Sequence, residues 1–150
     1  MDMDIYLYCI EYSNYNDVKK VIFEYFKENL QEDIIYKSNY ISETDYVEDC
    51  GCSLFYMSIE SEFTSKELDL EFTLEDYQIR TNVSICINLF TDTIIDGICV
   101  LKGLIKRLED MFQTNIIILD NSSKEVYISS GNKHYIDEAF WNPKNCWDVD

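Results

Sequence analysis

A long amphipathic helix between two apolar strands constrains the fold of this 150-residue chain more than any other feature. From Asp92 onward, large apolar side chains recur every three or four residues, which is the spacing of one helix face. The members of this stripe are Ile94, Ile98, Leu101, Ile105, Leu108 and Phe112, with Ile95, Leu104 and Met111 beside them. An alternating run precedes the helix at 83–89, and an apolar run follows it at 116–119. The stretch therefore predicts strand, helix and strand, with one face of the helix buried.

Three residues indicate how this helix begins and packs. Asp92 is suited to the N-cap, where its carboxylate accepts a hydrogen bond from an otherwise unpaired backbone amide. Gly97 and Gly103 each lower helix stability by up to about 1 kcal/mol relative to alanine. Their presence predicts close packing against a sheet, because a glycine lets the backbone of a neighbour approach.

The remaining patterns predict an α+β domain spanning 1–150. A strand at 3–12 has two apolar faces, which is typical of a central strand, and a helical stripe follows it as far as Leu30. The other predicted strands are 34–41, 54–63, 68–75, 77–90, 116–120 and 125–129, with a short segment at 134–136. For 68–75, an extended loop anchored by its apolar side chains is the alternative. In the tail, Phe140, Trp141 and Trp147 are expected to anchor the chain end on the domain.

The order of these elements favours one type of sheet. Consecutive strands in the middle of the chain lack helical crossovers, and parallel neighbours require such crossovers. We therefore expect a largely antiparallel sheet of five to seven strands, with two helices packed on one face.

The six cysteines predict a reducing environment more readily than a disulfide framework. No charged start followed by an apolar secretory run is present, and no apolar run is long enough to cross a membrane. We expect mostly free thiols and a cytoplasmic location. Cys50 and Cys52 flank Gly51 in a polar stretch, 42–53, which predicts a loop. A zinc site there would need a second ligand pair, which the lone His134 does not complete, so an ordinary turn is favoured.

The residue pattern gives little support for catalysis. With one histidine, any nucleophile–histidine–carboxylate triad must use His134, and no nucleophile motif accompanies it. The chain contains four glycines and no glycine-rich phosphate loop. The pairs of nearby carboxylates have the alternating or loop setting of solvated side chains. The sequence therefore predicts a protein that is not an enzyme and that holds no metal or cofactor.

The strongest functional signal is negative charge. The formal charge is −17, from 29 acidic and 12 basic residues, which disfavours direct binding to nucleic acid or to an anionic membrane. Between positions 43 and 76 there are 11 acidic residues and one basic residue, with tyrosines among them. Aromatic anchors in an anionic field suit an interface with a cationic protein, although a solvated acidic face is the simpler alternative. The candidate partner-binding residues are Glu60, Glu62, Asp69, Glu71, Tyr56 and Tyr46.

A resemblance to a known family extends over roughly the second half of the chain. The segments concerned are VSICINLF, DTIIDGICVLKGLIKRLED, NIIILDNSSKEVYISSG and the pair Phe140–Trp141, and the opening MDIYLYCIEY is similar in style. Together they resemble bacterial immunity proteins of the SitI type, which pair with polymorphic or contact-dependent toxins. The resemblance implies a protein without catalytic residues that binds its cognate toxin. The acidic middle of the chain and its cysteine-rich stretch depart from the family pattern.

Two functions follow as hypotheses. The first is a cytoplasmic immunity protein that neutralises a cationic, nuclease-like toxin by stoichiometric occlusion. The second is an inhibitor from a phage or mobile element that presents spaced carboxylates to a host nuclease or defence protein, as a mimic of nucleic acid. Competition by DNA or RNA distinguishes them, because only the mimic must be displaced.

Overall fold

A computed structural model gives the fold of the chain and describes residues 3–9, 15–30, 35–40, 46–62, 65, 68–112, 114–131 and 133–142. Its centre is an eight-stranded sheet in which every pair of neighbours is antiparallel, in the order β2-β3-β4-β5-β1-β6-β7-β8. The strands are β1 (Met3–Cys9), β2 (Ile35–Tyr40), β3 (Tyr46–Gly51), β4 (Phe55–Ser61), β5 (Val83–Leu89), β6 (Ile116–Asp120), β7 (Glu125–Ser129) and β8 (His134–Ile136).

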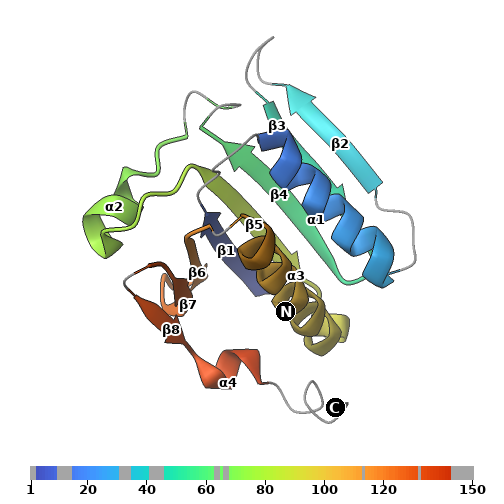
Figure 1. Cartoon of the computed structure of the whole chain (residues 1–150). Coiled ribbons are helices and arrows are strands. Elements are labelled where there is room, and N and C mark those ends of the chain that lie inside the picture. The colour runs from blue at the N-terminus through green and yellow to red at the C-terminus, as the bar shows by residue number, and fades with distance from the viewer. Residues whose placement is uncertain are drawn as a thin grey trace.

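Two long helices lie side by side on one face of the sheet (Figure 1). They are α1 (Tyr15–Leu30) and α3 (Ile94–Phe112), and a 3-10 turn, η1 (Thr91–Thr93), leads into the second of them. This arrangement confirms the α+β class and the antiparallel sheet, with two long helices on one face. The expected counts are too low, because the described part of the chain has eight strands rather than five to seven and four α-helices rather than two. Strand β1 is central as predicted, since it pairs with both β5 and β6.

The main core lies between this helix pair and the sheet. Alternate residues of β1, β4 and β5 point into it, and Ile5, Ile85 and Met57 are completely buried there. On α3 the buried positions include Ile98, Leu101, Leu104, Ile105 and Leu108, as the stripe predicts. Met111, which the spacing places at the edge of that stripe, is instead 59% exposed.

Two shorter helices complete the described part of the chain. Helix α2 (Glu71–Tyr77) packs on the opposite face of the sheet, where the Phe72 ring meets Tyr8 edge-on at 5.0 Å between centroids. Beneath it, Ile117, Leu119 and Ile128 form a second, smaller apolar cluster. Helix α4 (Glu138–Trp141) brings Trp141 into the main core, and its indole N–H donates to the Val126 carbonyl at 2.8 Å.

The two glycines of α3 both lie where the helix closely approaches another element, but Gly97 approaches β5 and Gly103 approaches α1. A Cβ on Gly97 would lie 2.8 Å from a methyl of Leu89 in β5, so this glycine does allow the sheet to approach. A Cβ on Gly103 would instead collide with the Tyr25 side chain of α1. The predicted contact with the sheet therefore holds for Gly97, whereas Gly103 permits the two helices to pack together.

Several predicted boundaries are wrong, for physical reasons that the structure supplies. The alternation of 68–75 predicts a strand, but the second half of this segment belongs to α2, in which Thr73 is buried and Leu74 is 52% exposed. The run 77–90 is a strand only from Val83, because Gln78 adopts a left-handed conformation (φ 58°) that ends α2.

Two further local predictions also fail. The polar stretch 42–53 predicts a loop, yet β3 forms there and buries Glu48 and Cys50. Asp92 lies inside the 3-10 turn rather than at an N-cap, and no side-chain cap is found at this turn. Trp147, predicted as a tail anchor, lies outside the described residues.

Candidate partner-binding face

The sheet face opposite α1 and α3 is the candidate binding surface. Over strands β2 to β5 no described helix covers this face, because α2 lies over the β1, β6 and β7 side of the sheet. Cross-strand pairing fixes the side chains that line up on it: Tyr6, Cys86, Ser58, Asp49 and Lys37 in one row, and Asp4, Asn88, Tyr56 and Gly51 in the next. We call this surface the open face.

Tyrosines and carboxylates are neighbours on the open face. Tyr56 is 46% exposed, and its pKa is raised first by partial burial and then by the adjacent Asp49 carboxylate, with which it also forms a hydrogen bond. The pKa of Tyr6 is raised in the same way, by burial and then by Cys86 and Asp4. Each phenol therefore stays neutral and can donate a hydrogen bond in a negatively charged setting.

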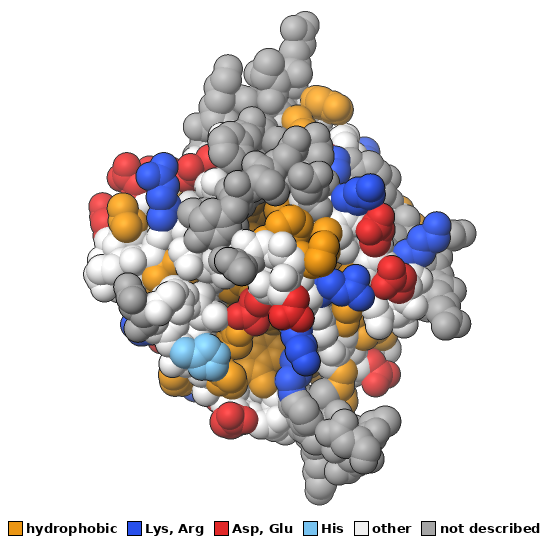
Figure 2. Space-filling view, viewed as in Figure 1, with side chains coloured by type: hydrophobic (Ala, Val, Ile, Leu, Met, Phe, Trp, Pro, Cys, Tyr) orange, Lys and Arg blue, Asp and Glu red, His pale blue; other side chains and the backbone are white. Residues whose placement is uncertain are grey.

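The negative charge of the protein is segregated from its helix pair. Helix α1 carries three acidic and three basic residues, and α3 carries three of each as well. The helix pair is thus formally neutral, and the whole charge of −17 belongs to the rest of the chain. Figure 2, which views the molecule from the helix side, accordingly shows basic and acidic side chains interspersed.

Three of the predicted site residues come together beside the open face. Glu62 follows β4, and Asp69 and Glu71 lie where the chain enters α2. The three line one hollow of about 540 Å³. The Glu62 carboxylate accepts a hydrogen bond from the Leu70 amide at 3.4 Å, and the Asp69 carboxylate accepts one from the Glu71 amide at 3.0 Å. Arg80 and three leucines also line the hollow, so its walls combine charge with apolar surface.

The other predicted site residues are divided between the two faces. Tyr56 and Glu60 alternate with the buried residues of β4 and therefore lie on the open face. Along β3, Tyr46 is two residues before buried Glu48 and four before buried Cys50, so the three side chains point to the same side of the sheet, which is the helix side. There its ring meets Tyr40 at 5.3 Å between centroids, at the β2 edge. Tyr46 therefore does not share a surface with the other five.

Sequence reasoning missed the contributions of β1 and β3 to the open face. Asp4, Tyr6 and Asp49 belong to it, and Ile35 of the edge strand β2 is 78% exposed. The alternation of the opening strand could have placed the first two. Asp49 could not be placed, because its segment has the composition of a loop.

The cysteine-rich stretch has a structural role. Cys50 is buried in β3, and burial together with nearby Cys52, Asp49 and Glu48 raises the pKa of its thiol to about 12. Cys50 and Cys52 are thiols outside any disulfide, as are Cys9 and Cys86, whereas Cys99 is disulfide-bonded. Among the described residues, no group of three histidine, cysteine or carboxylate side chains is placed to hold a metal ion.

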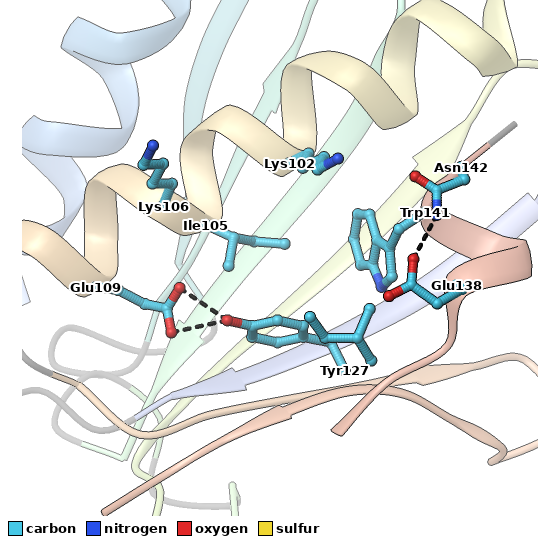
Figure 3. A pocket seen from close by; sticks show the side chains of 9 residues that line it. Lys102, Ile105, Lys106, Glu109, Tyr127, Glu138, Trp141 and Asn142 are labelled. Atoms are coloured by element: carbon cyan, nitrogen blue, oxygen red, sulfur yellow. Dashed lines mark hydrogen bonds between the residues drawn. The ribbon is translucent and has the colours of Figure 1, made fainter. Parts of the chain in front are cut away.

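A second concave region lies between α3 and the C-terminal elements (Figure 3). It has a volume of about 510 Å³ and is lined by Ile105, Tyr127 and Trp141, among others. The Tyr127 hydroxyl is 2.8 Å from both carboxylate oxygens of Glu109, and burial followed by this bond raises the tyrosine pKa. His134, the only histidine, is exposed on β8 with its ring 5.9 Å from that of Tyr127.

Comparison of the chain with protein-family models, with characterised proteins and with solved structures found no match. No described helix combines the length and the apolar character that a membrane crossing requires. The site is therefore defined by its own geometry: a sheet face that no described helix covers over β2 to β5, which carries tyrosines and carboxylates and continues into an acidic hollow at α2.

Proposed function

We propose that this chain is an immunity protein that binds a cationic toxin and neutralises it by stoichiometric occlusion. The observation that carries the proposal is the segregation of charge and aromatic residues. The helix pair is formally neutral, whereas the open face and the adjoining hollow bring exposed tyrosine and carboxylate side chains to one side of the molecule.

The two kinds of side chain have different tasks in such a complex. The carboxylates attract a basic partner and raise the association rate, an effect that salt screens over about 8–10 Å. Tyr56 and Tyr6 bury apolar ring surface on contact and keep a hydroxyl for hydrogen bonding, which slows dissociation. The phenols and their neighbouring carboxylates are held in strands, so little conformational freedom is lost on binding.

The acidic hollow extends the proposed interface at one end. Its leucines can contact the aliphatic stem of a lysine or arginine from the partner, while Glu62, Asp69 and Glu71 receive the charged head. Cytoplasmic location is part of the proposal, because an immunity protein protects the cell in which a toxin acts. The Cys99 disulfide is uncommon in a reducing compartment, so the location needs its own test by cell fractionation.

The test uses two double charge reversals that alter net charge equally. Glu60→Lys with Glu71→Lys changes the proposed interface, and Glu24→Lys with Asp110→Lys changes exposed positions on the helix pair. The partner is first captured from lysate with the wild-type chain, identified by mass spectrometry and purified. Its association with each variant is then followed at about 20 and about 200 mM salt, on either side of the range in which screening becomes strong.

The interface variant should associate about tenfold more slowly at low salt, with a smaller loss at high salt, and should no longer suppress the partner's toxicity. The helix-pair variant should retain most of both properties. Equal losses in the two variants would show that net charge alone matters and would remove the open face from the proposal. Displacement of the partner by DNA would instead favour a mimic of nucleic acid.

A further inference from the structure

A small polar hollow lies where three connections meet, and it shares Arg80 with the acidic hollow at the start of α2. Its volume is about 320 Å³. The exit from α2, the residue before β6 and the β7–β8 turn each contribute to its wall. The residues that matter for its chemistry are Tyr77, Arg80, Asn115, Ser130, Gly131 and Lys133.

Two cations from distant parts of the sequence face this hollow. Arg80 and Lys133 are both exposed, and neither forms an ion pair within the described part of the chain. The Lys133 ammonium lies 5.9 Å from the centroid of the Tyr77 ring, which holds the charge at the wall of the hollow. In a chain with 29 acids and 12 bases, the two cations thus line one hollow without either being held in a described ion pair.

Neutral hydrogen-bonding groups surround the same space. Ser130 accepts a hydrogen bond from the Lys133 amide at 3.2 Å, which fixes the turn, and Asn115 presents a side-chain amide. Nothing lies within 4 Å of the position that a Cβ on Gly131 would occupy, so a ligand can approach the backbone there. Arginine, lysine, amide and backbone donors are the groups that proteins use to bind phosphate oxygens.

The surroundings limit the size of the ligand. The hollow's volume of about 320 Å³ is at the lower end of the range for small-molecule sites. This volume is also larger than a bare ion requires. The Tyr77 ring offers a flat surface for an organic group. Asp76 and Glu125 lie close enough to Tyr77 to raise its pKa, after the larger effect of burial, and these carboxylates would repel an extended polyanion.

We propose that this hollow binds a small phosphate monoester, with Arg80 and Lys133 holding the phosphate group and Tyr77 contacting the organic part. The site shares Arg80 with the hollow at Glu62, but Lys133, Tyr77 and Gly131 line this hollow alone. Failure of phosphate binding at Gly131 and Lys133 would therefore leave the immunity proposal standing.

The experiment is a titration of the full chain with phenyl phosphate, inorganic phosphate and acetate, followed through backbone amide signals at constant ionic strength. Phenyl phosphate should produce saturable shifts at Gly131 and Lys133 and bind more tightly than inorganic phosphate. Arg80→Gln and Lys133→Gln should each weaken binding about tenfold. Arg80→Lys, which keeps the charge but loses the two-pronged geometry, should have an intermediate effect.

Lys20→Gln is the matched control, because it removes one exposed cation from α1 and should leave the titration unchanged. Absence of saturable shifts in the wild-type chain would overturn the proposal. Equal weakening by Lys20→Gln, or acetate binding as tightly as phenyl phosphate, would also overturn it, since either result means that any anion responds to overall charge.

Discussion

Replacing Gly103 with alanine tests the packing of the two long helices directly. A methyl group at this position would overlap the Tyr25 hydroxyl and lie 3.0 Å from Cζ and 3.5 Å from Cε1 of the same ring. Tyr25 is only 7% exposed, and its hydroxyl donates to the Val100 carbonyl at 2.9 Å. The ring must therefore move, and the hydrogen bond must lengthen or break.

The expected magnitude is a balance of opposing effects. Alanine favours the helix over glycine by about 1 kcal/mol. Against this, overpacking of a filled interface costs about 1–3 kcal/mol, and loss of a buried hydrogen bond costs about 1–2 kcal/mol more. We expect Gly103→Ala to lower the free energy of unfolding by about 1–4 kcal/mol, the remainder of these effects. The Arg107 guanidinium, 5.4 Å from the Tyr25 ring centroid, would lose its contact as well.

Urea unfolding followed by circular dichroism measures the effect, in a double-mutant cycle with Tyr25→Phe. Removing the hydroxyl takes away the atom that collides, so Gly103→Ala should cost at least about 1 kcal/mol less in a chain that already carries Tyr25→Phe. Gly131→Ala is a control, since its Cβ would meet no atom within 4 Å, and it should be nearly neutral. If Gly103→Ala stabilises the wild-type chain by about 1 kcal/mol, as on an open helix surface, the helix contact described above is refuted.

Three further predictions concern single side chains. Trp141→Phe removes the indole N–H that donates to Val126, and should lower the free energy of unfolding by about 1–3 kcal/mol in urea titrations; an unchanged midpoint would contradict this anchoring role. The pKa of Asp137 is lowered, first by Lys124 and then by backbone amides at the start of α4, so its contribution to stability is complete above the unfolded pKa of about 3.9 and is lost as pH falls through the lower folded value. Asp137→Asn should therefore flatten the pH dependence of unfolding in that acidic range, and a parallel curve would exclude the effect. Cys50 should resist alkylation by iodoacetamide at about pH 8 in the native protein and react on unfolding; rapid native labelling would disagree with its burial and raised pKa.

The sequence predicts the fold correctly where either the helical spacing of three to four residues or the strand alternation continues over enough residues to exclude the alternative. Ile98, Leu101 and Ile105 repeat the helical spacing along the 19 residues of α3, and the prediction of a buried face was correct. The hairpin of β6 and β7 was also predicted, because the apolar run from Ile116 and the segment at 125–129 flank a cluster of turn residues.

The sequence predicts the wrong element where a short segment is compatible with both helical spacing and strand alternation. Leu68, Leu70, Phe72 and Leu74 alternate as in a strand, but the helix forms because Phe72 finds Tyr8 on the far face of the sheet. That contact depends on β1, more than 60 positions earlier, and is invisible locally.

For the site, acidic composition alone identified Glu62, Asp69 and Glu71, which do share a hollow. Composition could not place Tyr46, because the face on which it lies is set by the pairing of β3 with β2 and β4. Nor could it bring Tyr6 and Asp49 to one surface, since their alignment requires the register of the strands between them.

The central position of β1 has a consequence for synthesis on the ribosome. Tyr8 pairs with Ile117, which follows it by 109 positions, and on its other side with Ser84. At typical elongation rates, the first strand to emerge waits roughly 5–20 s before its second neighbour exists. During that interval the apolar face of β1, formed by Ile5, Leu7 and Cys9, needs protection by a chaperone or by transient contact with α1. A nascent chain interrupted before β6 would keep one edge of its innermost strand unpaired and would be open to aggregation.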